Sequence, residues 1–286
     1  MKVVLAGAYG KLGSDILRTL VKQGHQVVAA DIIDRPVAGL DKAGYVYRRL
    51  DVTDAPSLQG LCDGADAVIT TVGLTTVNAK LTNYDIDHQG NLNLLGEALR
   101  AHVGKFVYIS VLHADAAPQD VPMVYAKKMM EDKIVASGIP YVIHRPSGYF
   151  YDIVKVFKPM IAKGKVTLLG TRPVYANVVD TPDFAAFIVA HLGDVNKVYD
   201  VGGRETWSYR QIAEMCFAAA GRQPKIATAP TWLFDVLAAL PANRANGKRP
   251  IIRFSKWTLS HDMVASTHVG EHSFKQYISD SFTKGE

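Results

Sequence analysis

A glycine-rich turn near the start of the chain has the composition of a phosphate-binding loop. The segment Gly7-Ala8-Tyr9-Gly10-Lys11-Leu12-Gly13 places a glycine at every third position. Gly7 would let the chain turn tightly, Gly10 would let the backbone approach a pyrophosphate, and Gly13 would let the next helix pack closely against a sheet. The free N–H groups and positive dipole end of that helix would favour an anion without any basic side chain.

The elements around this turn predict a dinucleotide site. Residues 2–6 form an unbroken apolar run of strand length, residues 14–24 have apolar side chains at helical spacing, and residues 26–31 read as a second buried strand. Asp31 ends that second strand, where a carboxylate can accept both ribose hydroxyls of a dinucleotide. The alternative is a glycine turn without a ligand in an unrelated α/β protein.

The following segments continue the alternation of strands and helices. We expect strands at 45–50, 67–72, 105–110 and 141–145, and helical segments at 83–102 and 125–137. This order predicts an α/β fold, a Rossmann doubly wound parallel sheet with helices on both faces and right-handed crossovers. Gly90, inside the 83–102 segment, would permit close packing against the sheet.

Two further strand ends add candidate contacts to the cofactor. Asp51 could accept a hydrogen bond from the adenine amine while Val52 covers the ring, although the same residues also precede a helix start. Thr71, Val72 and Gly73 follow the fourth strand on the side of the sheet where ligands bind. Gly73 would allow the cofactor to approach closely.

Composition indicates a globular protein of one large or two modest domains. The chain has 286 residues, 48% of them apolar, and a formal net charge of +5. Cys62 and Cys216 make no ligand spacing, so we expect no metal site and a reducing compartment. We expect no signal peptide, no transmembrane segment and a cytoplasmic location. Arg244, Lys248, Arg249, Arg253 and Lys256, near the C-terminus, carry much of the positive charge. We interpret them as a solvated surface, with attraction to an acidic substrate or to a membrane surface as the minority alternative. No motif indicates nucleic-acid binding.

Several segments resemble the extended and atypical short-chain dehydrogenase/reductases, and within them the NmrA-like and divinyl-reductase-like members. The resemblance implies an NAD(P)-binding Rossmann domain over residues 1–150 and a smaller C-terminal substrate-binding or lid region over 151–286, interleaved with the last strands. Residues 199–203 resemble the last strand of the family sheet. The segments that carry the resemblance are 7–13, 87–95, 106–110, 127–131, 137–140, 145–150, 177–180, 183–185 and 199–203, with Gly221-Arg222.

The chain departs from this family at its catalytic pair. Family catalysis uses a Tyr-x-x-x-Lys pair, in which the lysine lowers the tyrosine pKa for proton relay. Lys127 aligns with the lysine, but Met123 stands where the tyrosine should be. Tyr125 cannot replace it, because helical residues two positions apart point to different faces. The family serine falls near Leu112, with Ser110 one alternating step away.

Three residues are candidates for catalysis. Lys127 could bind the nicotinamide ribose or be an exposed helix lysine, and His113 could serve as an acid or be a surface loop residue. Tyr149 could donate a proton from its phenol or be a packing residue. We expect His144, which precedes Arg145-Pro146 inside a strand, to be structural.

These observations predict an NAD(P)-dependent oxidoreductase that acts on a small, mostly apolar carbonyl or unsaturated substrate. Asp31 favours NAD, while Arg35 leaves NADP open. The alternatives are a non-catalytic NAD(P)-binding sensor or assembly protein and a sugar-nucleotide epimerase or dehydratase, which the missing tyrosine disfavours. A homodimer is a further expectation. The expected cofactor contacts are Gly7, Tyr9, Gly10, Lys11, Leu12, Gly13, Asp31, Asp51, Val52, Thr71, Val72, Gly73, Ser110 and Lys127.

Overall fold

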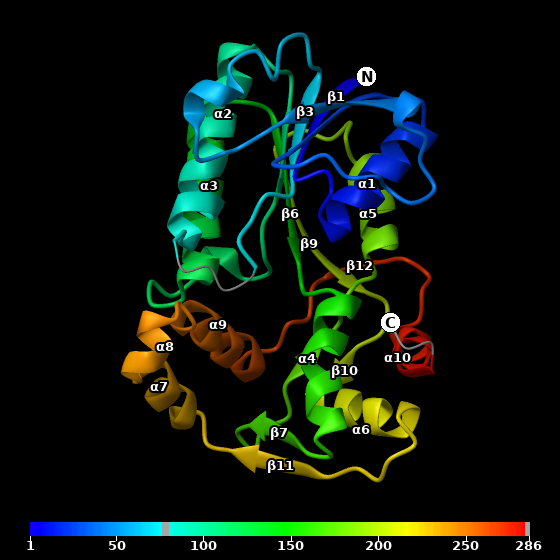
Figure 1. Cartoon of the computed structure of the whole chain (residues 1–286), viewed down its shortest axis with the longest axis vertical. Helices are drawn as coiled ribbons and strands as arrows, with labels where there is room; N and C mark the ends of the chain where they lie inside the picture. Colours follow the sequence, from blue (N-terminus) through cyan, green and yellow to red (C-terminus); the bar gives the residue numbers. More distant parts are fainter. Residues whose placement is uncertain (76–79, 284–286) are drawn as a thin grey trace. The chain divides into compact units, whose positions relative to one another are not determined.

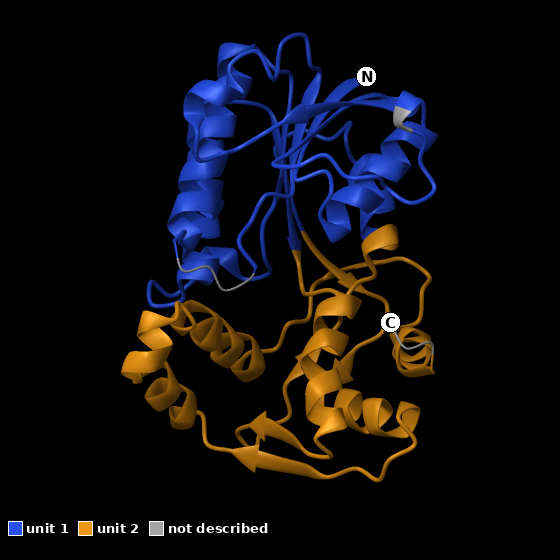
Figure 2. Ribbon diagram, viewed as in Figure 1, with its two compact units in different colours: residues 1–145, 184–199 blue, residues 146–183, 200–286 orange. Residues whose placement is uncertain are grey.

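The computed structural model describes residues 1–75 and 80–283 of the chain (Figure 1). These residues form two compact units (Figure 2). Unit 1 comprises residues 1–145 with 184–199, and unit 2 comprises residues 146–183 with 200–286. The division after residue 150 into a cofactor domain and a substrate region stays a prediction about function.

A large parallel sheet dominates the described part of the chain and confirms the predicted doubly wound architecture. Its eight strands lie in the order β12-β9-β6-β5-β4-β1-β2-β3, so the order reverses between β1 and β4. The register pairs Val4 with Val28 on one side and with Val68 on the other. The strands are β1 (Lys2–Ala6), β2 (Gln26–Asp31), β3 (Tyr45–Arg49), β4 (Ala67–Thr70), β5 (Phe106–Ile109), β6 (Tyr141–Pro146), β9 (Lys197–Gly203) and β12 (Thr267–Val269).

Helices cover both faces of the sheet in unit 1. The helices α2 (Asn91–Arg100) and α3 (Pro122–Ser137) lie on one face, and α1 (Lys11–Lys22) and α5 (Thr181–Ala190) lie on the other (Figure 1). Buried side chains of α2, α3 and alternate strand residues form a continuous apolar core on the first face. Short turns complete the unit: η1 (Lys42–Gly44), η2 (Ala55–Leu58) and η4 (Ala114–Ala116).

The structure corrects two expectations about individual elements, the start of α1 and the last strand of the sheet, and refines a third, the helical segment at 83–102. Helix α1 begins at Lys11, three residues before the predicted start, because Gly10 is still extended and Gly13 already lies in the first turn. The predicted 83–102 helix begins with a π-helical segment, η3 (Tyr84–Gly90), and becomes α-helical only at Asn91. The strand at 199–203 is not the last of the sheet, because β12 pairs in parallel with β9.

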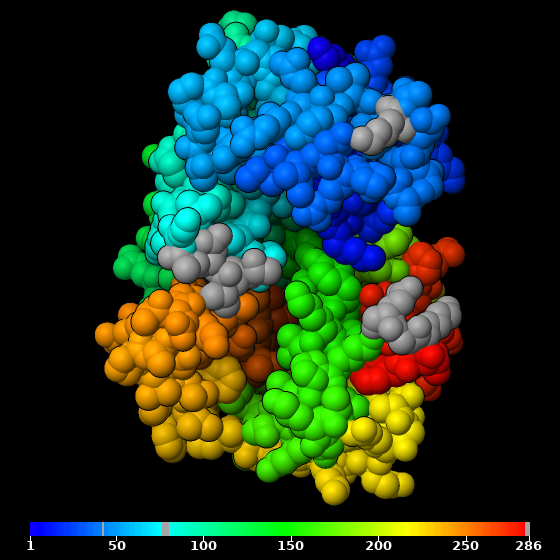
Figure 3. Space-filling view, in the orientation of Figure 1, coloured from blue at the N-terminus to red at the C-terminus, as the bar shows by residue number. Residues whose placement is uncertain are grey.

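Unit 2 combines helices with two small sheets. Strand β8 (Tyr175–Ala176) pairs antiparallel with β10 (Trp207–Ser208), and β7 (Val166–Leu169) pairs in parallel with β11 (Ile226–Ala229). Its helices are α4 (Phe150–Ala162), α6 (Tyr209–Ala219), α7 (Trp232–Ala239), α8 (Pro241–Ala245), α9 (Arg249–Ser260) and α10 (Phe274–Thr283). In the space-filling view, α7 and α8 form part of the visible surface (Figure 3). Among the described residues, no helix is long and apolar enough to cross a membrane.

Candidate functional site: a dinucleotide groove at the strand ends

The glycine turn after β1 packs closely against the segment after β4 and against the first turn of α1. Gly7 has a φ of +76°, and a Cβ atom there would lie 2.6 Å from Oγ1 of Thr71. A Cβ atom at Gly13 would lie 2.0 Å from the carbonyl oxygen of Gly7, so α1 packs directly against the turn. At Gly10 a Cβ atom would meet only that carbonyl, at an ordinary 3.4 Å. The backbone at Gly10 is therefore open to the groove that this residue lines.

A groove of about 390 Å³ follows the carboxyl ends of β1, β2, β3 and β4, around the point where the strand order reverses. This is the position at which doubly wound sheets bind their ligands. Nine predicted residues line the groove: Gly7, Tyr9, Gly10, Asp31, Asp51, Val52, Thr71, Val72 and Gly73. Sequence analysis did not name Ile32, Leu50, Thr53, Leu81 and Ile86, which also line it, and it named Arg35 only for cofactor choice.

Five predicted contacts are not on the groove wall: Lys11, Leu12, Gly13, Ser110 and Lys127. Lys11 is exposed at the start of α1, whereas Leu12 and Gly13 are buried. The groove therefore borders α1 only as far as Gly10, and the side chains of the first turn of α1 do not line it.

Backbone amides fix the acidic side chain at the end of β2. Asp31 Oδ2 accepts a hydrogen bond from the Tyr9 amide at 2.9 Å, and Oδ1 accepts one from the Ile32 amide at 2.8 Å. The Tyr9 ring stacks on Tyr47 with centroids 6.0 Å apart, and burial together with a hydrogen bond to Asp34 raises the pKa of its phenol. The carboxylate is therefore held at the groove in a fixed orientation.

Asp51 has a local partner two residues further along the chain, just before the short turn η2. Its Oδ1 accepts hydrogen bonds from the Thr53 hydroxyl at 2.6 Å and from the Thr53 amide at 3.1 Å. The bond from the hydroxyl lowers the pKa of the carboxyl group. Val52 packs against the π-helical segment, where a Cβ atom at Gly90 would lie 2.6 Å from Val52 Cγ2. Gly90 therefore permits close packing against Val52, in the segment after β3, whereas the sequence predicted packing against the sheet itself.

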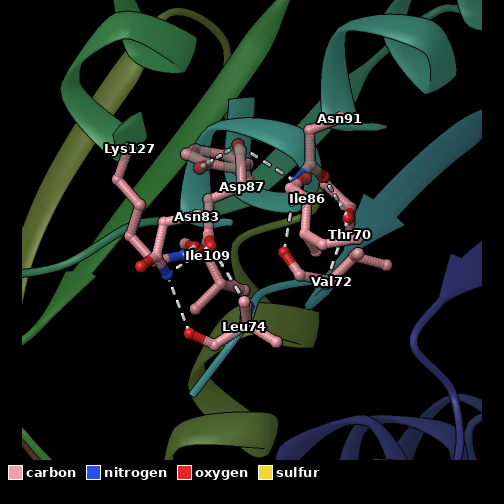
Figure 4. Close-up of polar contacts among 10 residues, drawn as sticks. Thr70, Val72, Leu74, Asn83, Ile86, Asp87, Asn91, Ile109 and Lys127 are labelled. Carbon is pink, nitrogen blue, oxygen red and sulfur yellow. Dashed lines mark hydrogen bonds and ion pairs between the residues drawn. The ribbon is translucent and has the colours of Figure 1, made fainter. Parts of the chain in front are cut away.

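A buried polar network surrounds Lys127 (Figure 4). The ammonium nitrogen lies 3.2 Å from Oδ1 of Asp87 and donates to the carbonyl oxygen of Ile109 at 3.2 Å. The other carboxylate oxygen of Asp87 accepts from the Leu74 amide at 3.1 Å and from Nδ2 of Asn83 at 3.0 Å. Burial raises the pKa of Tyr108, whose ring lies below the ammonium at 5.4 Å. Lys127 is thus a fixed cation and not an exposed helix lysine.

Gly73 connects this network to the groove. It lines the groove, and a Cβ atom at this position would lie 2.8 Å from Asp87 Oδ1 and 3.3 Å from Lys127 Nζ. The network therefore begins immediately behind the wall at Gly73.

Sequence analysis missed the role of Asp87, Asn83 and Asn91. Asn91 accepts from the Thr70 hydroxyl at 2.7 Å and donates to the carbonyl oxygens of Val72 and Ile86, which ties the strand end to the π-helical segment. A usable signal was present, since Asp87 and Asn91 are polar residues four positions apart in an otherwise amphipathic segment.

The remaining candidates have different environments. The Ser110 hydroxyl is buried at the end of β5 without a hydrogen-bond partner among the described residues. His113 precedes η4 with a left-handed φ of +61°. Tyr149 belongs to unit 2, where its ring stacks on Tyr151 and burial raises its pKa well above the ordinary value. Met123 is buried.

The fold and the groove together define a dinucleotide-binding protein of the Rossmann type. The model of a family described as NAD(P)H-binding matches residues 7–194, more than half of the chain. The chain therefore belongs to the NAD(P)H-binding family, as the sequence resemblance had predicted.

Individual relatives have different activities. The chain is 26% identical over 273 residues to the photosystem II assembly factor Ycf39 of Synechocystis sp., covering 94% of this chain and 80% of the relative. It is 25% identical over 234 residues to quinone oxidoreductase 2 of Escherichia coli, covering 77% and 75%. The crystal structure of an E. coli NADPH-dependent quinone oxidoreductase with NADPH has the same fold, with a TM-score of 0.76, 20% identity and coverage of 99% and 100%.

Proposed function

We propose that this protein is an NAD(P)-dependent oxidoreductase that acts on a small, mostly apolar carbonyl or unsaturated compound. The observation that carries the proposal is the position of the Lys127 ammonium, directly behind Gly73 at the edge of the cofactor groove. At this position the ammonium lies close enough to the groove to contact a bound cofactor, and this is why we propose a role beyond stabilising the fold. The similarity to quinone oxidoreductase 2 supports the same class of reaction.

The groove residues have distinct proposed roles. The turn at Gly7 and Gly10 and the start of α1 would hold the pyrophosphate, and Asp31 would accept the ribose hydroxyls. Asp51 and Val52 would contact the adenine. When bound, the nicotinamide ring supplies or accepts the hydride. Thr71, Val72 and Gly73 form a wall that the cofactor can approach closely.

Lys127 and Ser110 would act at the reactive end of the site. Asp87 and the Ile109 carbonyl hold the ammonium in place, so that it can donate to a ribose hydroxyl without reorganisation. The free hydroxyl of Ser110 can pair with the cofactor or the substrate, and this would satisfy its buried oxygen. His113 and Tyr149 remain the candidate proton donors.

For the choice of cofactor we propose NAD over NADP. The Asp31 carboxylate is fixed at the groove by two amides, and its charge would repel a 2′-phosphate. Arg35 also lines the groove and could pair with such a phosphate, so NADP is the alternative. A homodimer and a cytoplasmic location remain part of the proposal.

A non-catalytic sensor or assembly role is the second candidate. Met123 is buried where a catalytic tyrosine would stand, and the chain is similar to an assembly factor along most of its length. Epimerase or dehydratase chemistry needs the tyrosine phenol as a base, and Met123 does not supply one. This disfavours an epimerase or dehydratase.

The test combines cofactor binding with turnover. Calorimetry would compare NADH and NADPH, and absorbance of the reduced nicotinamide would then be followed with a panel of quinones and aldehydes. We expect Lys127→Ala to lower turnover about a hundredfold through lost positioning. Lys128→Ala is the matched control, because Lys128 is on the same helix and pairs with the exposed Asp132. Tight cofactor binding without any turnover would favour the sensor role, and no binding would contradict both.

A further inference from the structure

Helix α7 exposes a stripe of large apolar side chains. Trp232 and Val236 are 60% and 48% exposed, and their spacing of four residues places them on one side of the helix, while Leu240, which immediately follows α7, is 43% exposed. Ala238 is the buried residue of α7. A helix that is apolar on nearly every side is normally buried, so the exposed stripe indicates a surface for binding.

The charge of α7 itself is already neutralised. Asp235 is the single charged residue of the helix, and both of its carboxylate oxygens accept from Lys256 of α9 at 2.7 Å. This pair ties α7 to α9. The exposed stripe therefore belongs to a helix that is fixed within its own unit.

The segment that follows is strongly basic. From Val236 to His261 the sequence contains five basic residues, Arg244, Lys248, Arg249, Arg253 and Lys256, and no acidic residue. The rest of the chain carries equal numbers of basic and acidic side chains, so this segment accounts for the whole net charge of +5. Arg244 and Lys248 are exposed. We call Trp232, Val236, Leu240, Arg244 and Lys248 the α7 surface.

We propose that the α7 surface docks onto an anionic lipid bilayer. A tryptophan and a valine on one side of a helix, with a leucine at its end, can enter the boundary between headgroups and acyl chains, and the basic residues that follow in the sequence can contact lipid phosphates. A symmetric contact with a second copy would instead bring two basic segments together, which is electrostatically unfavourable. The surface would hold the protein at the membrane without a spanning helix.

Vesicle flotation tests this proposal with the full chain. Vesicles of phosphatidylcholine alone would be compared with vesicles that also contain phosphatidylglycerol, at low and high salt. We expect binding to the anionic vesicles only, weakened by salt. Arg244→Glu combined with Lys248→Glu should reduce that binding about tenfold or more, because each reversal replaces attraction with repulsion.

Matched variants separate this surface from general effects. Lys22→Glu with Lys163→Glu makes the same change in net charge at exposed positions elsewhere and should bind like the wild type. Trp232→Ser should weaken binding, whereas Val46→Ser, at an exposed apolar residue of β3, should not. Circular dichroism and thermal unfolding, measured for every variant, report whether the full chain, including unit 2, is folded.

Three results would overturn the proposal. One is the absence of vesicle binding by the wild type, and another is equal binding to neutral and anionic vesicles. The third is self-association in sedimentation velocity that Trp232→Ser abolishes, without vesicle binding, which would assign the stripe to a second copy of the chain.

Discussion

Lys127 Nζ lies 3.2 Å from Oδ1 of Asp87, and the two residues come from helical segments forty positions apart. The Asp87 side chain is 1% exposed and that of Lys127 is 14% exposed. Because both charges are largely removed from water, each is stabilised by the other. Both side chains also lie directly beside Gly73, which lines the groove. The ion pair therefore contributes to the fold at the position where we propose that Lys127 contacts the cofactor.

Replacing Asp87 should be strongly destabilising. Asp87→Ala leaves the Lys127 ammonium and the Leu74 amide without their partner, and we expect the free energy of unfolding to fall by about 3–5 kcal/mol. Urea denaturation measures this change. Asp132→Ala is the control, because it removes the exposed partner of Lys128 and should cost less than about 1 kcal/mol. Similar losses in the two variants would contradict a special role for the buried pair.

The close contact between α1 and the glycine turn gives a second prediction. Gly13→Ala would place a methyl group 2.0 Å from the Gly7 carbonyl oxygen, and we expect a loss of about 2 kcal/mol or more together with weaker cofactor binding. Gly96→Ala is the matched control in α2, where a Cβ atom meets nothing within 4 Å. This change should stabilise the fold by about 0.5–1 kcal/mol, since alanine is the better helix former. Thermal unfolding and calorimetry would distinguish the two variants.

The parts of the molecule that depend on local sequence were predictable. Glycine spacing, apolar strand runs and Asp31 at a strand end are short-range signals, and they predicted six of the eight strands of the sheet, α1 and most of the groove wall. The pairing of Asp87 with Lys127 could not be predicted in this way, because the two residues lie forty positions apart in the chain. The position of Asp87 depends on the π-helical segment and on the side-chain bonds of Asn91.

Strand β12 shows the same limit. Thr267, His268 and Val269 have no continuous apolar run, and these three residues form a strand because they pair with residues 201–203 at the sheet edge. This pairing is supplied by tertiary structure. A family pattern that ends the sheet at residue 203 therefore missed it.

Cofactor preference should depend on the Asp31 carboxylate. If Asp31 accepts the ribose hydroxyls as proposed, Asp31→Ser removes a charge that would repel a 2′-phosphate, so the affinity ratio of NADPH to NADH should rise about tenfold, equivalent to about 1.4 kcal/mol. Asp34→Ser is the control, because Asp34 accepts from the Tyr9 hydroxyl but does not line the groove. Calorimetric titration with both cofactors measures the ratio. An equal shift in the two variants would mean that general charge, and not contact with the ribose, sets the preference.

The last prediction concerns His144, which lies in β6 among aromatic rings. Phe184, Phe187 and Tyr199 lie within 5.9 Å of its ring centroid, and neither ring nitrogen has a hydrogen-bond partner among the described residues. Burial lowers the pKa of its imidazole to about 3. The residue is therefore neutral in the folded protein at ordinary pH, which agrees with the structural role predicted for it.

This low pKa predicts a specific loss of stability in acid. Above about pH 6.5 the imidazole of His144 is neutral in both states, but below it the unfolded chain binds a proton that the folded protein does not, so its contribution to the unfolding free energy falls by about 1.4 kcal/mol per pH unit toward pH 3. His144→Phe keeps a ring in the cluster and should remove this part of the pH dependence. His268→Gln changes an exposed histidine and should keep it. Denaturation curves between pH 7 and pH 5 would contradict the prediction if His144→Phe and the wild type lost stability equally, because the buried imidazole would then not be the group that titrates on unfolding.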